Sequence, residues 1–513
     1  MRPYAPPRWL APLCVGGLCF ALRLPALGRL PSPAGDEGNW ALLGLSLARN
    51  SPAALPPDAA FVSRLFAWLV ALSFRLSAPS WVSARLVLVI AFSLGAMGAA
   101  GLVTRRDALR APWLVGALVA THPWGLWWSR TVSVPYALAA AAMWVGVLVW
   151  RRGLETQRAW LLLVAGQCLG LAMQCTPLAL LGFATVALGT GLTAPSTLRR
   201  PRFWLALGAG GLHGFAFVTG LLHMPSGARQ RLAAPLSHQL FSLLNQDLAM
   251  LSGVATVRHF VGAPGWLGGL SAGLTGLALL ALWPRAARAS SRWSLAAWAV
   301  TLFGLPLLLS PGRAWHMPAL DSDRYGFVWL VPWVLTLDDA ADDPARRRRW
   351  ASAAVVLGAA LLGLGSLARA LDGPHLDGGP LAHQGGAYRG WQPYAPDAAL
   401  VDAVYARVRD DARGAPAQIL YADYAFHAIR FVNASHDAPI THGFEQTRAL
   451  APRRGYAVFF TDAAFTEGPA AAWYRALNRR FFSQWRADAI APVQIGCWRR
   501  GAAPCAVELW RAE

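Results

Sequence analysis

Long apolar runs follow one another through the first 371 residues of the chain. A helix needs about 20 such residues to cross a hydrocarbon core roughly 30 Å thick. The runs, one of them long enough for two helices, lie at Trp9–Leu27, Ser83–Val103, Pro112–Trp128, Val132–Trp150, Trp160–Leu192, Phe203–Leu222, Gly265–Trp283, Trp293–Ser310, Tyr325–Leu337 and Ala351–Leu371. The pattern predicts a polytopic α-helical membrane protein.

Arginines are concentrated in short polar gaps between these runs. The clusters are Arg105, Arg106 and Arg110; Arg151, Arg152 and Arg158; Arg199, Arg200 and Arg202; Arg285, Arg288 and Arg292; and Arg346–Arg349. Two apolar segments separate each cluster from the next, so all of them can face the cytoplasm, where positive residues are enriched. The loops between them are then external.

The shorter run Phe61–Leu76 sets the number of crossings. An amino terminus inside the cell and an inside Arg105 require an even number of crossings between them, and this run carries Arg64 and Arg75. We therefore assign it to the membrane interface as an amphipathic helix. Trp9–Leu27 is expected to be an uncleaved signal anchor. The chain then has about eleven transmembrane helices and an external carboxyl terminus.

A change in composition after Leu371 divides the chain into two predicted domains. Residues 1–371 form the transmembrane domain, and a Gly- and Pro-rich linker opens a soluble domain over 372–513. The expected helices are Ala398–Ala412 and Ala470–Trp485, and the expected strands are Gln418–Tyr421, Ala428–Val432, Tyr456–Phe460 and Val493–Trp498. This alternation predicts a small α/β fold on the external side.

Charge and cysteine content refine this prediction. The net charge of +20 comes without a single lysine, and its arginines follow the topology, so a nucleic-acid partner is not expected. Cys497 and Cys505 flank a turn-rich stretch that could close a hairpin. A disulfide between them requires an oxidising compartment.

Two adjacent carboxylates, Asp36 and Glu37, stand in the first external loop just before an amphipathic segment that begins at Trp40. A carboxylate at the mouth of an apolar cavity suits a general base that removes a proton from a nucleophile. Acidic residues also favour the first turn of any helix, so helix capping is the alternative explanation.

The order of several motifs resembles a known family. Asp36-Glu37 follows the first membrane helix, Pro56-Pro57 precedes an apolar run, and Ser129-Arg130 ends a later one. Thr176-Pro177 opens another helix, and Arg324-Tyr325 enters a late span. This order is similar to that of the GT-C membrane glycosyltransferases of the protein-O-mannosyltransferase and aminoarabinose-transferase type, over roughly Trp9 to Ala370.

The resemblance implies transfer of a sugar from a polyprenyl-phosphate donor to a lipid, glycan or protein acceptor on the external face. It implies Asp36 as the catalytic carboxylate, with Glu37 beside it. Inversion at the anomeric carbon needs such a base and a group that stabilises the lipid-phosphate leaving group. The location implied is the inner membrane of a bacterium, with a periplasmic carboxyl-terminal domain.

Arginine suits the leaving group because its guanidinium binds phosphate oxygens in pairs. Arg324 and Arg130 lie at external ends of predicted spans, and Tyr325 adjoins the first of them. Capping of a helix, or pairing of Arg324 with Asp321 or Asp323, is the alternative. Trp40 and His316 lie in external segments and are candidate substrate contacts.

One feature departs from the family pattern. Many members carry a second acidic residue after the Ser-Arg pair, whereas residues 131–135 contain none. A divalent metal cofactor, which needs two or more oxygen ligands, is left open but loses support. An inactive member of the family and a lipid or glycan transporter or flippase stay as alternatives. A transporter, however, more often has charged mid-membrane residues and paired halves.

Overall fold

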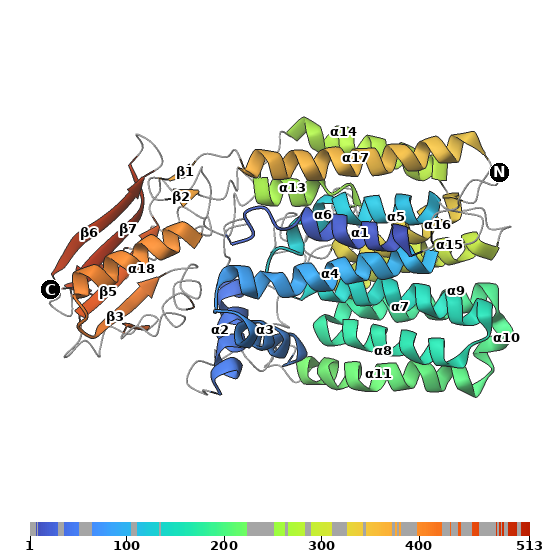
Figure 1. The fold of residues 1–513 in the computed structure, drawn as a ribbon, viewed down its shortest axis with the longest axis horizontal. Helices are drawn as coiled ribbons and strands as arrows, with labels where there is room; N and C mark the ends of the chain where they lie inside the picture. Colours follow the sequence, from blue (N-terminus) through green and yellow to red (C-terminus); the bar gives the residue numbers. More distant parts are fainter. Residues whose placement is uncertain are drawn as a thin grey trace.

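A bundle of long helices makes up most of the computed structural model, and a β-sheet lies beyond one end of it (Figure 1). The structure describes residues 7, 9–28, 35–50, 64–103, 110–132, 135–222, 251–261, 265–282, 289–309, 326–341, 345–371, 375–376, 379–380, 398–422, 431, 440–442, 454–460, 479, 482–483, 485–486, 491–499 and 504–512.

Each apolar run expected to cross the membrane coincides with one or two helices. They are α1 (Leu10–Ala21), α4 (Trp81–Val103), α5 (Arg110–Thr121), α6 (Pro123–Trp128), α7 (Tyr136–Thr156), α8 (Ala159–Cys175), α9 (Leu180–Thr193), α11 (Pro201–Leu222), α14 (Gly265–Leu282), α15 (Ala289–Leu309), α16 (Leu330–Ala341) and α17 (Arg346–Leu371). Shorter helices are α10 (Pro195–Leu198) and α13 (Val254–Val261). The number of crossings stays a prediction.

The outer surface of the bundle is apolar. Leu212 of α11, Leu280 of α14 and Phe303 of α15 are largely exposed. Three of the described helices, α4, α7 and the part of α17 from Arg348, are long and apolar enough to cross a membrane by length and composition. Leu94 of α4 and Leu361 of α17 are exposed as well, and exposed apolar side chains on such helices are suited to contact with lipid.

The run Pro112–Trp128 is broken, whereas the sequence predicts one span. Pro123 has no N–H and therefore cannot continue the hydrogen-bond ladder of α5. The backbone N–H of Trp124 donates instead to Nδ1 of His122 at 3.2 Å, and α6 begins there. The chain then turns at Ser129–Val132 before α7.

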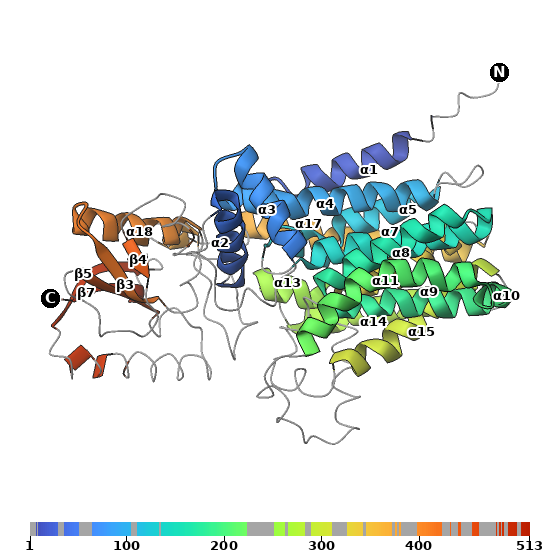
Figure 2. The same ribbon diagram turned by 90° about the horizontal axis from the view of Figure 1, so that it is seen from below.

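Two helices, α2 (Gly35–Arg49) and the amphipathic α3 (Arg64–Leu76), lie across the end of the bundle rather than along it (Figures 1 and 2). They pack against each other through Trp40 and Phe66, whose ring centroids are 4.8 Å apart. Arg75 of α3 donates to the carbonyl of Leu47 at 3.0 Å. The helix expected after Asp36-Glu37 is confirmed, and the crosswise placement of α3 agrees with its predicted place at the interface.

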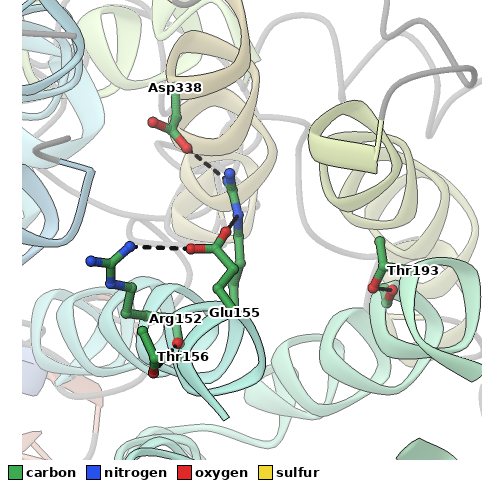
Figure 3. Close-up of polar contacts among 7 residues, drawn as sticks. Arg152, Glu155, Thr156, Thr193 and Asp338 are labelled. Atoms are coloured by element: carbon green, nitrogen blue, oxygen red, sulfur yellow. Dashed lines mark hydrogen bonds and ion pairs between the residues drawn. The ribbon is translucent and has the colours of Figure 1, made fainter. Parts of the chain in front are cut away.

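Buried ion pairs join helices at the opposite end of the bundle. Nη1 of Arg151 in α7 lies 2.7 Å from Oδ2 of Asp338 in α16. Within α7, Nε of the same arginine lies 3.0 Å from Oε1 of the partly exposed Glu155; Asp338 and Glu155 are labelled in Figure 3. The adjacent Asp339 accepts from Ser291 of α15 at 2.7 Å and pairs with Arg348 of α17 at 3.5 Å. These contacts fix the carboxyl end of α16 against three neighbouring helices.

Among the described residues, the carboxyl-terminal sheet has five strands in the order β4-β3-β5-β7-β6. The strands are β3 (Ala417–Ala422), β4 (Ile440–His442), β5 (Arg454–Phe460), β6 (Pro492–Arg499) and β7 (Cys505–Ala512). The first three in sheet order are parallel to one another. β7 pairs antiparallel with β5, and β6 pairs antiparallel with β7. A short hairpin, β1 (His375–Leu376) with β2 (Gly379–Pro380), precedes them.

Side chains alternate between the two faces of this sheet. Tyr456 faces α18 (Ala398–Ala412), where its hydroxyl donates to Asp411 at 2.8 Å. Phe459 faces the other way and stacks on Phe482 at 4.7 Å. Cys497 and Cys505 form a disulfide between β6 and β7, with their Cα atoms 5.4 Å apart.

Some of the helices and strands predicted for the carboxyl-terminal region are present in the structure, and others are not. Ala398–Ala412, Gln418–Tyr421, Tyr456–Phe460 and Val493–Trp498 are present as α18, β3, β5 and β6. Of the expected strand Ala428–Val432 only Phe431 is described, and its backbone is helical, so the strand is wrong there. The expected helix Ala470–Trp485 lies mostly outside the described residues.

Phe431 also links the carboxyl-terminal region to the bundle. Its ring stacks on Phe74 of α3 at 5.7 Å and lies 4.7 Å from the ring of Trp81 in α4. All three side chains are buried. The two regions therefore share an aromatic contact at the end of the bundle where α2 and α3 lie.

Candidate active site

An ion pair between α2 and α4 is the first component of the site. Nη2 of Arg85 lies 2.7 Å from Oε2 of Glu37, and its Nε lies 3.2 Å from Oε1. Both side chains are completely buried. Nη1 of Arg85 also donates to the carbonyl of Leu27 at 2.8 Å. A buried charge pair needs this paired geometry because the desolvation of both ions must be offset.

The turn Ser129–Val132 is the second component, and the same carboxylate holds it. The backbone N–H of Val132 donates to Oε1 of Glu37. Arg130 is fully buried, and its guanidinium donates to the carbonyl of Pro25. The hydroxyl of Thr131 donates to Trp128 at 3.2 Å. Glu37 thus connects the first turn of α2, the start of α4 and the turn before α7.

Three arginines from separate parts of the chain converge here. Arg130 lies near enough to both Arg85 and Arg23 for their positive charges to repel each other. Arg23 is completely buried and donates to Oγ of Ser129 at 2.6 Å. Concentrated positive charge in a site of low polarity is stabilised by a nearby anion.

The candidate residues from the sequence are only partly brought together. Asp36 lies in the first turn of α2, next to Glu37, but its side chain lies outside the description. Arg324, Tyr325 and His316 lie outside the described residues altogether. Trp40 is buried against Phe66 and serves the packing of α2 on α3.

The fold itself has a counterpart among solved structures. The crystal structure of ArnT from Cupriavidus metallidurans in the apo state matches with a TM-score of 0.56. The match covers 98% of this chain and 97% of the ArnT chain at 13% sequence identity. The chain has the ArnT fold.

This match confirms the resemblance inferred from the order of the motifs, at the level of the fold. An ArnT-like arrangement of apolar helices, followed by a small carboxyl-terminal sheet, makes the chain a membrane protein with a GT-C-like architecture. No protein-family model matches the sequence, and no curated protein sequence matches it either.

The next question is whether the described residues could bind a divalent metal ion. In the part of the chain that the structure describes, no group of three or more His, Cys, Asp or Glu side chains could hold a metal. Both oxygens of Glu37 are bound to Arg85 and to the backbone of Val132. An oxygen-rich divalent site would need free carboxylates, so Glu37 does not fit as a metal ligand.

Two arginines within the ArnT-like bundle were not among the residues predicted for the site. Arg23 falls in the apolar run Trp9–Leu27 and Arg85 in Ser83–Val103. An ionisable residue inside a membrane helix is costly and by default suggests a function. That rule, applied to every apolar run, would have singled out both.

Proposed function

We propose that this chain is an inverting glycosyltransferase that moves a sugar from a polyprenyl-phosphate donor to an acceptor. The observation that carries the proposal is the position of the Asp36-Glu37 pair within an ArnT-like fold. Asp36 lies in the first turn of α2, and the neighbouring Glu37 is fixed by Arg85 and the turn Ser129–Val132.

The reaction follows from this placement. The acceptor hydroxyl or amine attacks the anomeric carbon, and Asp36 takes the proton that it loses. The bond between the anomeric carbon and the phosphate oxygen breaks on the opposite face, and polyprenyl phosphate leaves with the electron pair. In this proposal Glu37 positions α2 rather than taking the proton, because both of its oxygens already accept hydrogen bonds.

The leaving phosphate is assigned to arginine. The positive charges of Arg23, Arg85 and Arg130 converge beside Glu37 and would be relieved by an anion. Arg130 and Arg324 are proposed to stabilise the phosphate, with Tyr325 beside Arg324. His316 and Trp40 are proposed to contact the substrate. Because Trp40 is buried, its effect on substrate binding is proposed to be indirect: it holds α2 in position.

The proposed setting is the inner membrane of a bacterium. Residues 1–371 form the transmembrane domain with about eleven crossings and a cytoplasmic amino terminus, and 372–513 form a periplasmic α/β domain. The site, α2, α3 and the sheet lie at one end of the bundle, which supports a single external face for them (Figure 1). The sugar and the acceptor are left unspecified.

Turnover of a labelled polyprenyl-phosphate sugar by the purified protein in lipid nanodiscs tests the proposal. We expect product from the parent protein and its loss in Asp36→Asn, with the same unfolding temperature and donor binding. Asp410→Asn, which removes an exposed carboxylate of α18 paired with Arg409, is the matched control and should turn over normally.

The alternatives predict different results. Full turnover by Asp36→Asn would refute the proposed base. Donor binding without turnover by the parent would indicate an inactive member. Movement of an unmodified lipid or glycan across the membrane, unaffected by Asp36→Asn, would indicate a transporter or flippase.

A further inference from the structure

Arg23, just after α1, is a buried charge to which the proposed reaction assigns no individual role. Its guanidinium lies 4.5 Å from the centroid of the Phe92 ring and is completely buried. It donates to Ser129 Oγ at 2.6 Å, to the Cys19 carbonyl at 2.8 Å, to the Ala120 carbonyl at 3.1 Å and to the Val119 carbonyl at 3.4 Å. Arginine stays charged even when buried, so its donors need such oxygen partners.

The carbonyls of Val119 and Ala120 lack their normal helical partners because of the break between α5 and α6. In a continuous helix they would accept from the N–H groups of residues 123 and 124. Pro123 has no N–H, and the N–H of Trp124 donates to the His122 ring at 3.2 Å. Arg23 therefore supplies the donors that the break removes.

The same guanidinium reaches the turn that carries Arg130. Ser129, its partner at 2.6 Å, is the first residue of that turn. In the reverse direction, the Arg130 guanidinium donates to the carbonyl of Pro25, two residues after Arg23. The segment after α1 and the turn after α6 are thus joined by reciprocal arginine contacts. An apolar side chain at position 23 would leave three carbonyls and a hydroxyl without this donor in an apolar environment.

We propose that Arg23 is a positioning residue that holds the turn Ser129–Val132, and with it Arg130, in place for the phosphate of the donor. This inference rests on the proposed function. The helix break then has two effects. The bend at His122-Pro123 frees the carbonyls of Val119 and Ala120 to accept from Arg23, and it directs the chain into the turn Ser129–Val132.

The test combines Arg23→Leu with Pro123→Ala. Arg23→Leu should lower the unfolding temperature and raise the KM for the polyprenyl-phosphate donor about tenfold or more, the size of one lost hydrogen bond to a charged group. The value of kcat should change less, because Asp36 is untouched. Pro123→Ala restores an N–H for the Val119 carbonyl. The double variant should therefore recover part of the unfolding temperature while KM stays raised.

Arg348→Leu is the matched control because it removes another buried arginine, at the opposite end of the bundle, where it donates to the Leu282 carbonyl at 2.8 Å. It should lower the unfolding temperature and leave KM unchanged. Arg23→Lys keeps the charge but presents a point donor, so we expect a KM between those of the parent and Arg23→Leu.

Two results would overturn the inference. The first is recovery of unfolding temperature and KM together in the double variant, which would make Arg23 purely structural. The second is an unchanged dissociation constant of Arg23→Leu for undecaprenyl phosphate, measured by tryptophan fluorescence. This binding measurement needs no turnover, so it separates failure of the inference from failure of the proposed function.

Discussion

Gly170 of α8 faces Gly210 of α11 so closely that neither residue has room for a side chain. A Cβ on Gly170 would overlap the carbonyl oxygen of Gly210, and a Cβ on Gly210 would overlap the backbone of Gly166. Glycines four residues apart on both helices permit this approach, as is common where membrane helices cross. Beside the crossing, Gln174 Nε2 and His213 Nδ1 lie 2.7 Å apart.

Substitution of Gly210 by leucine should therefore separate α8 from α11. We expect a loss of about 1–3 kcal/mol or more, typical of overpacking, because the obstruction is backbone and cannot rotate away. The matched control is Gly208→Leu on the same helix, where a Cβ meets nothing within 4 Å. Thermal unfolding in detergent measures both, and equal unfolding temperatures for the two variants would contradict the crossing.

Exchanging the positions of Glu37 and Arg85 should not restore the stability that the ion pair gives. Glu37→Ala leaves Arg85 buried without its carboxylate, at a cost of about 3–5 kcal/mol. Exchange of the two residues, Glu37→Arg with Arg85→Glu, keeps opposite charges but removes the acceptor for the N–H of Val132 and the donor for the carbonyl of Leu27.

We expect the exchanged variant to stay destabilised and inactive. Glu37→Gln retains an acceptor and should lie between the parent and Glu37→Ala. Unfolding temperature and turnover of the three variants measure this order. Recovery of both in the exchanged variant would show that charge alone, without the backbone contacts, defines the pair.

The aromatic contact of Phe431 should affect the site at a distance. Trp81, which packs on Phe431, lies one turn before Arg85, and the guanidinium of Arg85 lies 5.9 Å from its ring centroid. Phe431→Ala removes the ring between Phe74 and Trp81, so we expect weaker attachment of the carboxyl-terminal region and lower turnover.

Limited proteolysis and turnover measure the two effects. Phe431→Leu, which keeps an apolar group, should be milder, and Trp68→Ala, an exposed aromatic of α3, should change neither. Normal turnover in Phe431→Ala with faster release of a carboxyl-terminal fragment would separate attachment from catalysis.

The helices of the bundle could be predicted because each depends on a local property of the sequence. Apolar length marks a span, and the crosswise α3 is marked by Arg64 and Arg75 within its run and by the even number of crossings that an inside Arg105 requires. The break at His122 was missed. Pro123 stands in a continuous apolar run, and the bond from Trp124 to the His122 ring that stabilises the break has no signature in hydropathy.

The site was predicted less completely, because its contacts join distant positions. Glu37 was singled out by its neighbour Asp36, yet Arg85 lies 48 residues away along the chain. The strand β7 was not predicted, since Cys505–Ala512 mixes charged and apolar residues and gains its place through pairing with β5 and β6. The Glu37–Arg85 pair and the strand β7 depend on contacts between residues far apart in the sequence, which a local pattern does not indicate.

The disulfide between Cys497 and Cys505 depends on the compartment in which the carboxyl-terminal region folds. Thiols are kept reduced in the cytosol and are oxidised beyond the inner membrane. Under the proposed orientation, the strands β6 and β7 become joined only after the carboxyl-terminal region has been translocated. In protein isolated with its thiols blocked, the oxidised fraction of this pair therefore measures how many molecules have their last strands on the oxidising side of the membrane.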